Sequence, residues 1–178
     1  MKPHCVNLVI DVRSIPYSRY APQFNRASIQ QSLNQYGLAY EYFGDVIGGK
    51  FTEPIFFNEN GVIDFHKVIK SELFQRGLDT VIEKIHDDTK LVLMCAEKDP
   101  LYCHRFLLIS RELNNRGVHP IHLLADGSVI NHDELLNNIT YGKKQSDFVQ
   151  IGLLPDNQRA DTDMVYESLM REKMKKKR

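Results

Sequence analysis

Cysteine is scarce in this chain of 178 residues, and the odd count of three is a poor basis for a disulfide framework. No apolar run approaches the roughly 20 residues that a membrane-spanning helix needs. The first residues lack the apolar core and the cleavage site of a signal peptide. We therefore expect a cytoplasmic protein with free thiols and no membrane partner.

The net charge of zero hides a split along the chain. Residues 171–178 contain six basic side chains and one acidic one, whereas residues 1–170 contain 17 basic and 22 acidic side chains. A mildly acidic body argues against a protein that coats nucleic acid with a broad basic face. The basic end is either a solvated terminus or a local contact for phosphate groups.

Apolar segments alternate between strand-like and helix-like patterns, and no internal repeat is visible. The predicted strands are residues 6–12, 38–43, 91–95 and 119–124, and the predicted helices are residues 27–36, 65–74, 78–86, 101–115 and 131–139. This alternation predicts one three-layer α/β domain over residues 1–142, with a mostly parallel sheet of about four or five strands and helices on both faces. Residues 143–178 are expected to form a C-terminal arm, partly disordered or helical, that ends in the basic tail.

The expected strand order 2-1-3-4 places a switch point between the first and third strands. Asp11 and Arg13 follow the first strand, while Cys95 and Glu97 follow the third. The sequence therefore predicts a polar pocket at the C-terminal ends of these two strands.

A charged loop and a predicted helix follow Cys95, with Asp99 as the helix cap and Pro100 in its first turn. Cys103 then lies near the positive end of the helix dipole, which favours a thiolate. Either cysteine is alternatively a small core residue. The two thiols form a redox pair only if their Cα atoms lie within about 7 Å.

A metal site would have to combine Cys95, Cys103 and His104 with a fourth ligand such as His122 or His132. The spacing matches no standard zinc pattern, and adjacent residues of a helix point in different directions. We therefore predict no metal and no cofactor.

Charged side chains of both signs accumulate at the predicted pocket. They are Asp11, Arg13, Glu97, Lys98, Asp99, His104 and Arg105, with Arg19 and Tyr20 on the neighbouring loop. One interpretation is a structural network of ion pairs that clamps the loops. The other is a ligand site in which Arg13 and Arg105 hold a phosphate or carboxylate, and Glu97 or Asp11 acts as general base.

The long loop over residues 14–25 carries aromatic and basic side chains in alternation. They are Tyr17, Tyr20 and Phe24, interleaved with Arg13, Arg19 and Arg26. Such a loop can stack on a nucleotide or a single strand and neutralise its charge. Alternatively, the aromatic side chains anchor the loop to the core.

Three segments resemble signatures of the bacterial and archaeal family called domain of unknown function 488. They are Asp11-Val12-Arg13-Ser14-Ile15-Pro16 with the following residues up to Asn25, then residues 95–105 (CAEKDPLYCHR), and Ile121-His122-Leu123-Leu124-Ala125-Asp126-Gly127. The resemblance covers about residues 6–136 and implies a single α/β domain with a polar pocket, but it implies no activity. The tail after about residue 142 lies outside it.

Asp11-Val12-Arg13 also resembles the opening of rhodanese domains, whose second signature is a cysteine loop at a strand end. Rhodaneses and cysteine phosphatases wrap an anion with the loop after the cysteine. Here Leu101 occupies the position of the phosphatase arginine, and Glu97 and Asp99 repel anions. Sulfur transfer and phosphatase chemistry are therefore not favoured.

Taken together, these patterns favour an enzyme or ligand-binding protein that acts on a phosphorylated small molecule or a nucleic-acid-related substrate. The predicted catalytic residues are Cys103, Glu97 and Asp11, and the predicted ligand-binding residues are Arg13, Arg19, Tyr20, Lys98, His104 and Arg105. One alternative is a non-enzymatic interaction module that docks a partner through its tail and the apolar patch Ile55-Phe56-Phe57. Another is a thiol redox switch.

Overall fold

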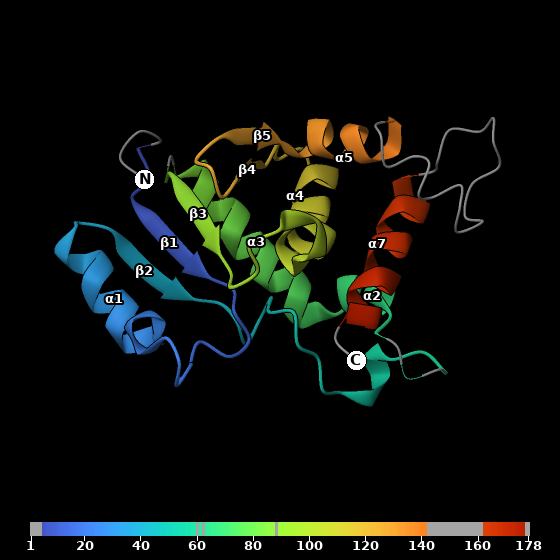
Figure 1. Ribbon diagram of the computed structural model, residues 1–178, viewed down its shortest axis with the longest axis horizontal. Helices are drawn as coiled ribbons and strands as arrows, with labels where there is room; N and C mark the ends of the chain where they lie inside the picture. The colour runs from blue at the N-terminus through green and yellow to red at the C-terminus, as the bar shows by residue number, and fades with distance from the viewer. Residues whose placement is uncertain (1–4, 60, 62, 88, 142–161, 177–178) are drawn as a thin grey trace. The chain divides into compact units, whose positions relative to one another are not determined.

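The computed structural model describes residues 5–59, 61, 63–87, 89–141 and 162–176 (Figure 1). The chain divides into two compact units, an N-terminal unit that ends at Ala96 and a C-terminal unit that begins at Glu97. Most of the predicted arm falls outside the described residues. None of the described helices combines the length and the apolarity that a membrane crossing requires.

A parallel sheet of three strands forms the centre of the N-terminal unit. The strands are β1 (Leu8–Asp11), β2 (Ala39–Tyr42) and β3 (Leu91–Met94), in the order β2-β1-β3. Asp11 pairs with Tyr42 on one side and Met94 on the other, and all four residues of β1 are buried. The adjacency predicted for the first and third strands is thus confirmed, because the central strand carries the most apolar and β-branched run.

Helical segments occupy the connections of this unit. They are η2 (Pro22–Phe24), α1 (Arg26–Gln35), η3 (Pro54–Phe56), α2 (Phe65–Ile69) and α3 (Glu72–His86). The break between α2 and α3 lies at residues 70–71, earlier than the predicted break after residue 74. The cause is Ser71, whose side chain accepts a hydrogen bond from the Phe74 amide and caps α3. In α3, Phe74, Leu78 and Val81 are buried at helical spacing.

Gly44 allows the chain after β2 to pass directly against the chain after β1. A Cβ atom at this position would lie 2.0 Å from the carbonyl oxygen of Arg13. Only glycine fits such a close backbone approach. This contact brings the carboxyl ends of β1 and β2 together at the edge of the sheet where the polar residues follow.

The C-terminal unit has elements of its own. They are η4 (Pro100–Tyr102), the π-helix η5 (Arg105–Ser110), α4 (Arg111–Asn115), β4 (Ile121–Leu123), β5 (Val129–Asn131), α5 (His132–Tyr141) and α7 (Thr162–Lys176). Phe106, Leu107, Leu108 and Ile109 are fully buried. Helix α7 contacts η4, η5 and α5, so this part of the predicted arm is a packed helix.

The α/β class is confirmed, but the strand count of the predicted sheet is wrong. Within the residues that the structure describes, the parallel sheet has three strands, not four or five, and β4 pairs antiparallel with β5. The cause is the tight turn at Asp126-Gly127, where Gly127 has a φ of +86° and the Asp126 side chain accepts hydrogen bonds from Ser128. A turn this short returns the chain at once as a hairpin, whereas a parallel partner needs a long crossover.

Candidate functional site

Asp11, Arg13 and Tyr40 form a charge-balanced cluster at the end of β1. The Asp11 carboxylate is fully buried and accepts from Arg13 Nε at 2.9 Å, from Arg13 Nη2 at 2.6 Å and from the Tyr40 hydroxyl at 2.7 Å. The hydrogen bond to Asp11 raises the pKa of Arg13. Burial, and then the hydrogen bond to Asp11, raises the pKa of Tyr40. The cluster therefore holds a carboxylate, a guanidinium and a neutral phenol in one fixed arrangement.

Arg13 also connects the sheet to the long loop. Its Nη1 donates to the carbonyl oxygen of Phe24 at 2.9 Å, and its side chain is 12% exposed. These contacts match the structural ion-pair interpretation for Arg13 and Asp11. A ligand-binding role for Arg13 and a catalytic role for Asp11 stay predictions.

Hydrogen bonds within residues 14–26, hereafter the aromatic loop, fix its backbone. The Ser18 amide donates to Asn25 Oδ1 at 2.6 Å, and the Arg26 amide donates to the Pro16 carbonyl at 2.9 Å. The Ser18 hydroxyl accepts from the amides of Tyr20 and Ala21 at 3.2 and 3.3 Å. With the bond from Arg13, these contacts hold the backbone of an otherwise irregular segment.

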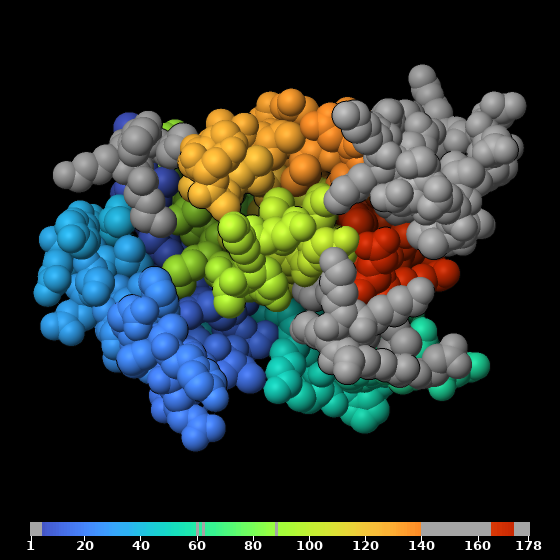
Figure 2. Space-filling view, viewed as in Figure 1, coloured from blue at the N-terminus to red at the C-terminus, as the bar shows by residue number. Residues whose placement is uncertain are grey.

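The aromatic side chains of this loop face solvent. Tyr17 is 65% exposed, Tyr20 95% and Phe24 54%, and Arg19 is also exposed. Figure 2 shows the segment as a blue projection on the surface of the N-terminal unit. These exposures contradict the alternative that the aromatic side chains anchor the loop to the core. Order in the loop comes from polar contacts, which leaves the rings available to a ligand.

Four predicted site residues meet in the C-terminal unit: Glu97, Cys103, His104 and Arg105, hereafter the Cys103 cluster. The Cys103 sulfur accepts from Arg105 Nε at 3.1 Å and from the Arg105 amide at 3.4 Å. The thiol lies 3.6 Å from Glu97 Oε2, and Arg105 Nη2 donates to the Glu97 carbonyl at 2.9 Å. Guanidinium and amide donors favour negative charge on sulfur, and the carboxylate can accept the thiol proton.

Local structure explains how neighbouring residues converge here. Asp99 Oδ1 accepts from the Leu101 amide and caps η4, as predicted, and Pro100 is its first residue. The predicted continuous helix is interrupted, because Cys103 ends η4 with an extended backbone, φ −96° and ψ 138°. Cys103 and His104 therefore do not diverge as adjacent residues of one helix do, and their ligand atoms approach each other.

The other predicted residues lie differently. Arg19 and Tyr20 are on the aromatic loop, and Lys98 is exposed next to Glu97 in the chain. Cys95 directly follows β3 and is half-buried. A shared pocket formed by the two strand ends stays a prediction.

A buried chain of hydrogen bonds crosses the C-terminal unit, and sequence reasoning missed it. His122 Nε2 lies 3.1 Å from His132 Nδ1, and His132 Nε2 lies 2.6 Å from the Tyr166 hydroxyl. Burial, followed by the charges of His132 and Arg105, lowers the pKa of His122 to about 4. Burial also lowers the pKa of His132 to about 4. Both imidazoles are therefore neutral at pH 7.

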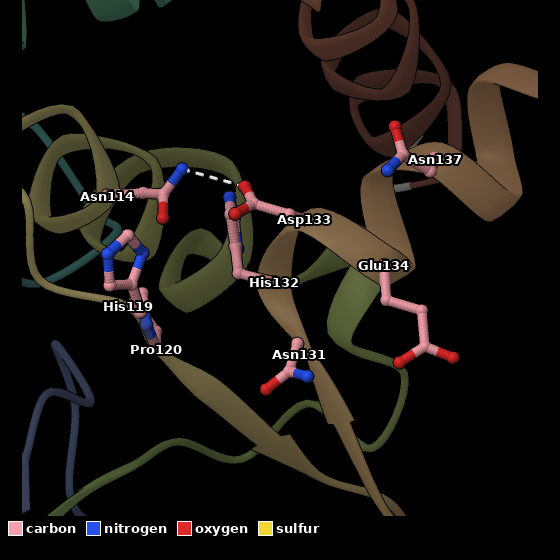
Figure 3. A pocket seen from close by; sticks show the side chains of 8 residues that line it. All are labelled: Asn114, His119, Pro120, Asn131, His132, Asp133, Glu134 and Asn137. Carbon is pink, nitrogen blue, oxygen red and sulfur yellow. Dashed lines mark hydrogen bonds between the residues drawn. The ribbon is translucent and has the colours of Figure 1, made fainter.

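His132 also lines a pocket of about 540 Å³ in this unit. Its other lining residues are Asn114, His119, Pro120, Asn131, Asp133, Glu134 and Asn137. Figure 3 shows the amide of Asn114 bonded to Asp133, with an Nδ2–Oδ1 distance of 2.8 Å. The signal for this network in the sequence is the concentration of His119, His122 and His132 in a short stretch, of which only His122 and His132 entered the sequence prediction, as candidate metal ligands.

Comparison with known proteins gives one family. Searches of the curated proteins and of the solved structures found no match. The family model described as domain of unknown function DUF488 matches residues 1–111, which include the first two signature segments. The third segment, Ile121 to Gly127, lies beyond the matched residues. Because the match spans more than half of the chain, this protein belongs to the DUF488 family, a domain of unknown function.

Proposed function

We propose that the protein binds a nucleotide or single-stranded nucleic acid through its aromatic loop. The observation that carries this proposal is the exposure of Tyr17, Tyr20 and Phe24 on a backbone held by hydrogen bonds. Every base has a flat face that stacks on such rings, so recognition tolerates many sequences.

Rigidity of the loop makes stacking more favourable. A flexible loop would lose conformational entropy when it binds, and that loss would subtract from the stacking energy. Here the bonds of Arg13 to Asp11 and Phe24 order the loop before any ligand arrives. Each stacked base is then expected to contribute about 1–3 kcal/mol.

Charge in this segment is suited to a phosphate backbone. Residues 12–40 contain three arginines, Arg13, Arg19 and Arg26, and no acidic side chain. Asp11 neutralises Arg13, which leaves two arginines to contact phosphate. With two phosphate contacts, the logarithm of the binding constant should fall with the logarithm of salt concentration with a slope of roughly −1.4.

Chemistry, if the protein is an enzyme, is proposed at the Cys103 cluster. Cys103 would be the reactive group and Glu97 the proton acceptor, supported by their 3.6 Å separation. Arg105, with His104 and Lys98, would bind a phosphorylated substrate. A cytoplasmic location fits three cysteines that form no disulfide, because thiols persist in a reducing compartment.

Replacing both Tyr17 and Tyr20 by alanine is expected to weaken binding of a single-stranded oligonucleotide of about 12 nucleotides. Loss of even one stacked base corresponds to a decrease in affinity of roughly 5- to 150-fold, so the double variant should lose at least this much. Fluorescence anisotropy of a labelled RNA or DNA strand of mixed sequence measures the change.

Tyr36→Ala is the matched control, because Tyr36 is 75% exposed in the same unit but follows α1 outside the loop. Its affinity should equal that of the wild type. Equal losses in the control and the loop variant, or no binding by the wild type at low salt, would contradict the proposal.

The interaction module and the thiol redox switch stay predictions. In the apolar patch, Ile55 is 71% exposed, but Phe56 and Phe57 are half-buried. Phe56 also packs edge-on against Phe51, with ring centroids 5.4 Å apart. A single exposed isoleucine is ordinary for a protein surface, so the patch supports partner docking less than the aromatic loop supports stacking.

A further inference from the structure

We infer that Glu97, Cys103 and His104 form a binding site for one divalent metal ion of the zinc class. Their ligand atoms, a carboxylate oxygen, a thiol sulfur and an imidazole nitrogen, all lie within 4.8 Å of one another. Sulfur, nitrogen and oxygen donors together are the set that Zn²⁺ binds in proteins. The site lies in the C-terminal unit and does not depend on nucleic-acid binding by the aromatic loop. It is an alternative to the thiol chemistry proposed above, because the same thiol, carboxylate and imidazole would be metal ligands.

The distance between two of these donors matches a tetrahedral centre. Zinc lies about 2.3 Å from thiolate sulfur and about 2.1 Å from carboxylate oxygen, so the edge joining these two ligands is about 3.6 Å. The distance from Cys103 Sγ to Glu97 Oε2 is 3.6 Å. The observed separation of these two atoms is therefore the one that a shared tetrahedral ion would require.

Backbone geometry makes the convergence possible. The extended backbone at Cys103 and the helical backbone at His104, φ −62° and ψ −19°, let two adjacent side chains approach one point. Cys103 is fully buried, and His104 is 3% exposed. Two largely buried donors and one half-buried acid define a site with one side toward solvent.

Arg105 supplies the outer interactions that metal sites use. Its Nε and amide hydrogens point at the Cys103 sulfur, and its Nη2 fixes the carbonyl of Glu97. Such N–H donors orient a ligating thiolate and stabilise its charge. Metal binding would displace the thiol proton that Cys103 now donates to Glu97, and the divalent ion would offset the negative charges of the thiolate and the carboxylate.

Three protein ligands leave one tetrahedral position. Water can occupy it, as in catalytic zinc sites. With water in this position, the ion would supply a Lewis acid next to Arg105.

Cobalt titration of the full-length, reduced and metal-stripped protein tests the inference. We expect one Co²⁺ per chain and the near-ultraviolet absorption of a cobalt–thiolate bond, displaced by added Zn²⁺. Cys103→Ser should abolish this absorption. Arg105→Gln removes only an outer partner of the site and should weaken Co²⁺ binding by roughly 10- to 100-fold. His104→Gln removes a ligand and should weaken Co²⁺ binding by more than Arg105→Gln does.

Cys5→Ser and His119→Gln are the controls, since both residues are exposed and lie outside the cluster. Circular dichroism identifies any variant that has lost its fold, and Arg105→Gln keeps the test decisive because it leaves all three ligands. Absence of a thiolate band in the wild type, or a band that survives in Cys103→Ser, would overturn the inference. Oligonucleotide binding would be unaffected by that outcome.

Discussion

Asp11→Ala is expected to lower the free energy of unfolding by about 3–5 kcal/mol. The substitution leaves the Arg13 guanidinium, whose side chain is 12% exposed, without its counter-ion. It also removes the acceptor of the Tyr40 hydroxyl. Buried charges that lose a partner cost far more than the pair contributes. Urea denaturation at pH 7 measures the change.

Two further variants separate the charge from the contacts. Tyr40→Phe removes one hydrogen bond and should cost about 1 kcal/mol. The double variant Asp11→Leu with Arg13→Met removes both charges and should recover most of the loss of Asp11→Ala. A change within about 0.5 kcal/mol for Asp11→Ala, the range of ordinary surface substitutions, would contradict a structural role for the pair.

The second large effect is a loss of stability in acid that originates in the C-terminal unit. His122 and His132 have pKa values lowered from 6.5 to about 4 by burial. Between about pH 4 and pH 6.5, each imidazole is protonated in the unfolded chain but neutral in the folded protein. Each therefore lowers the unfolding free energy by about 1.4 kcal/mol per pH unit as the pH falls. The stabilisation is complete above pH 6.5 and decreases toward pH 4, by up to about 3 kcal/mol for each group.

Urea denaturation at several pH values between about 7 and 4.5 tests this linkage. His132→Gln should reduce the pH slope by about half, because one titrating group is removed. His119→Gln, which changes an exposed histidine of the same unit, should keep the slope of the wild type. Equal slopes in all three proteins would show that the buried imidazoles do not titrate in this window.

Strong local signals explain the parts of the fold that the sequence predicted. The apolar, β-branched run over Val6 to Val12 is typical of a buried strand, and adjacent parallel strands then bring Asp11 level with Met94. The Asp99-Pro100 pair marked the start of a helix correctly. These features depend on residues close in sequence, where capping and periodicity are decisive.

Features that depend on weak or distant signals were missed. Strand β5 has only three residues, which are too few to show the apolar/polar alternation of a strand, so its pairing with β4 was not predicted. The extended backbone at Cys103 is a local exception inside an apparently helical pattern. The hydrogen bond between His132 and Tyr166 spans 34 residues and depends on α7, which no spacing rule connects to the hairpin.

Nuclear magnetic resonance of the isotope-labelled protein with an unlabelled single-stranded oligonucleotide tests the binding claim most directly. We expect the largest shift changes at the amides of Tyr17, Tyr20 and Phe24, and none at Tyr36, because only the loop rings are proposed to stack on bases. Saturation with the loop resonances unmoved, or shifts spread evenly over both units, would contradict the account.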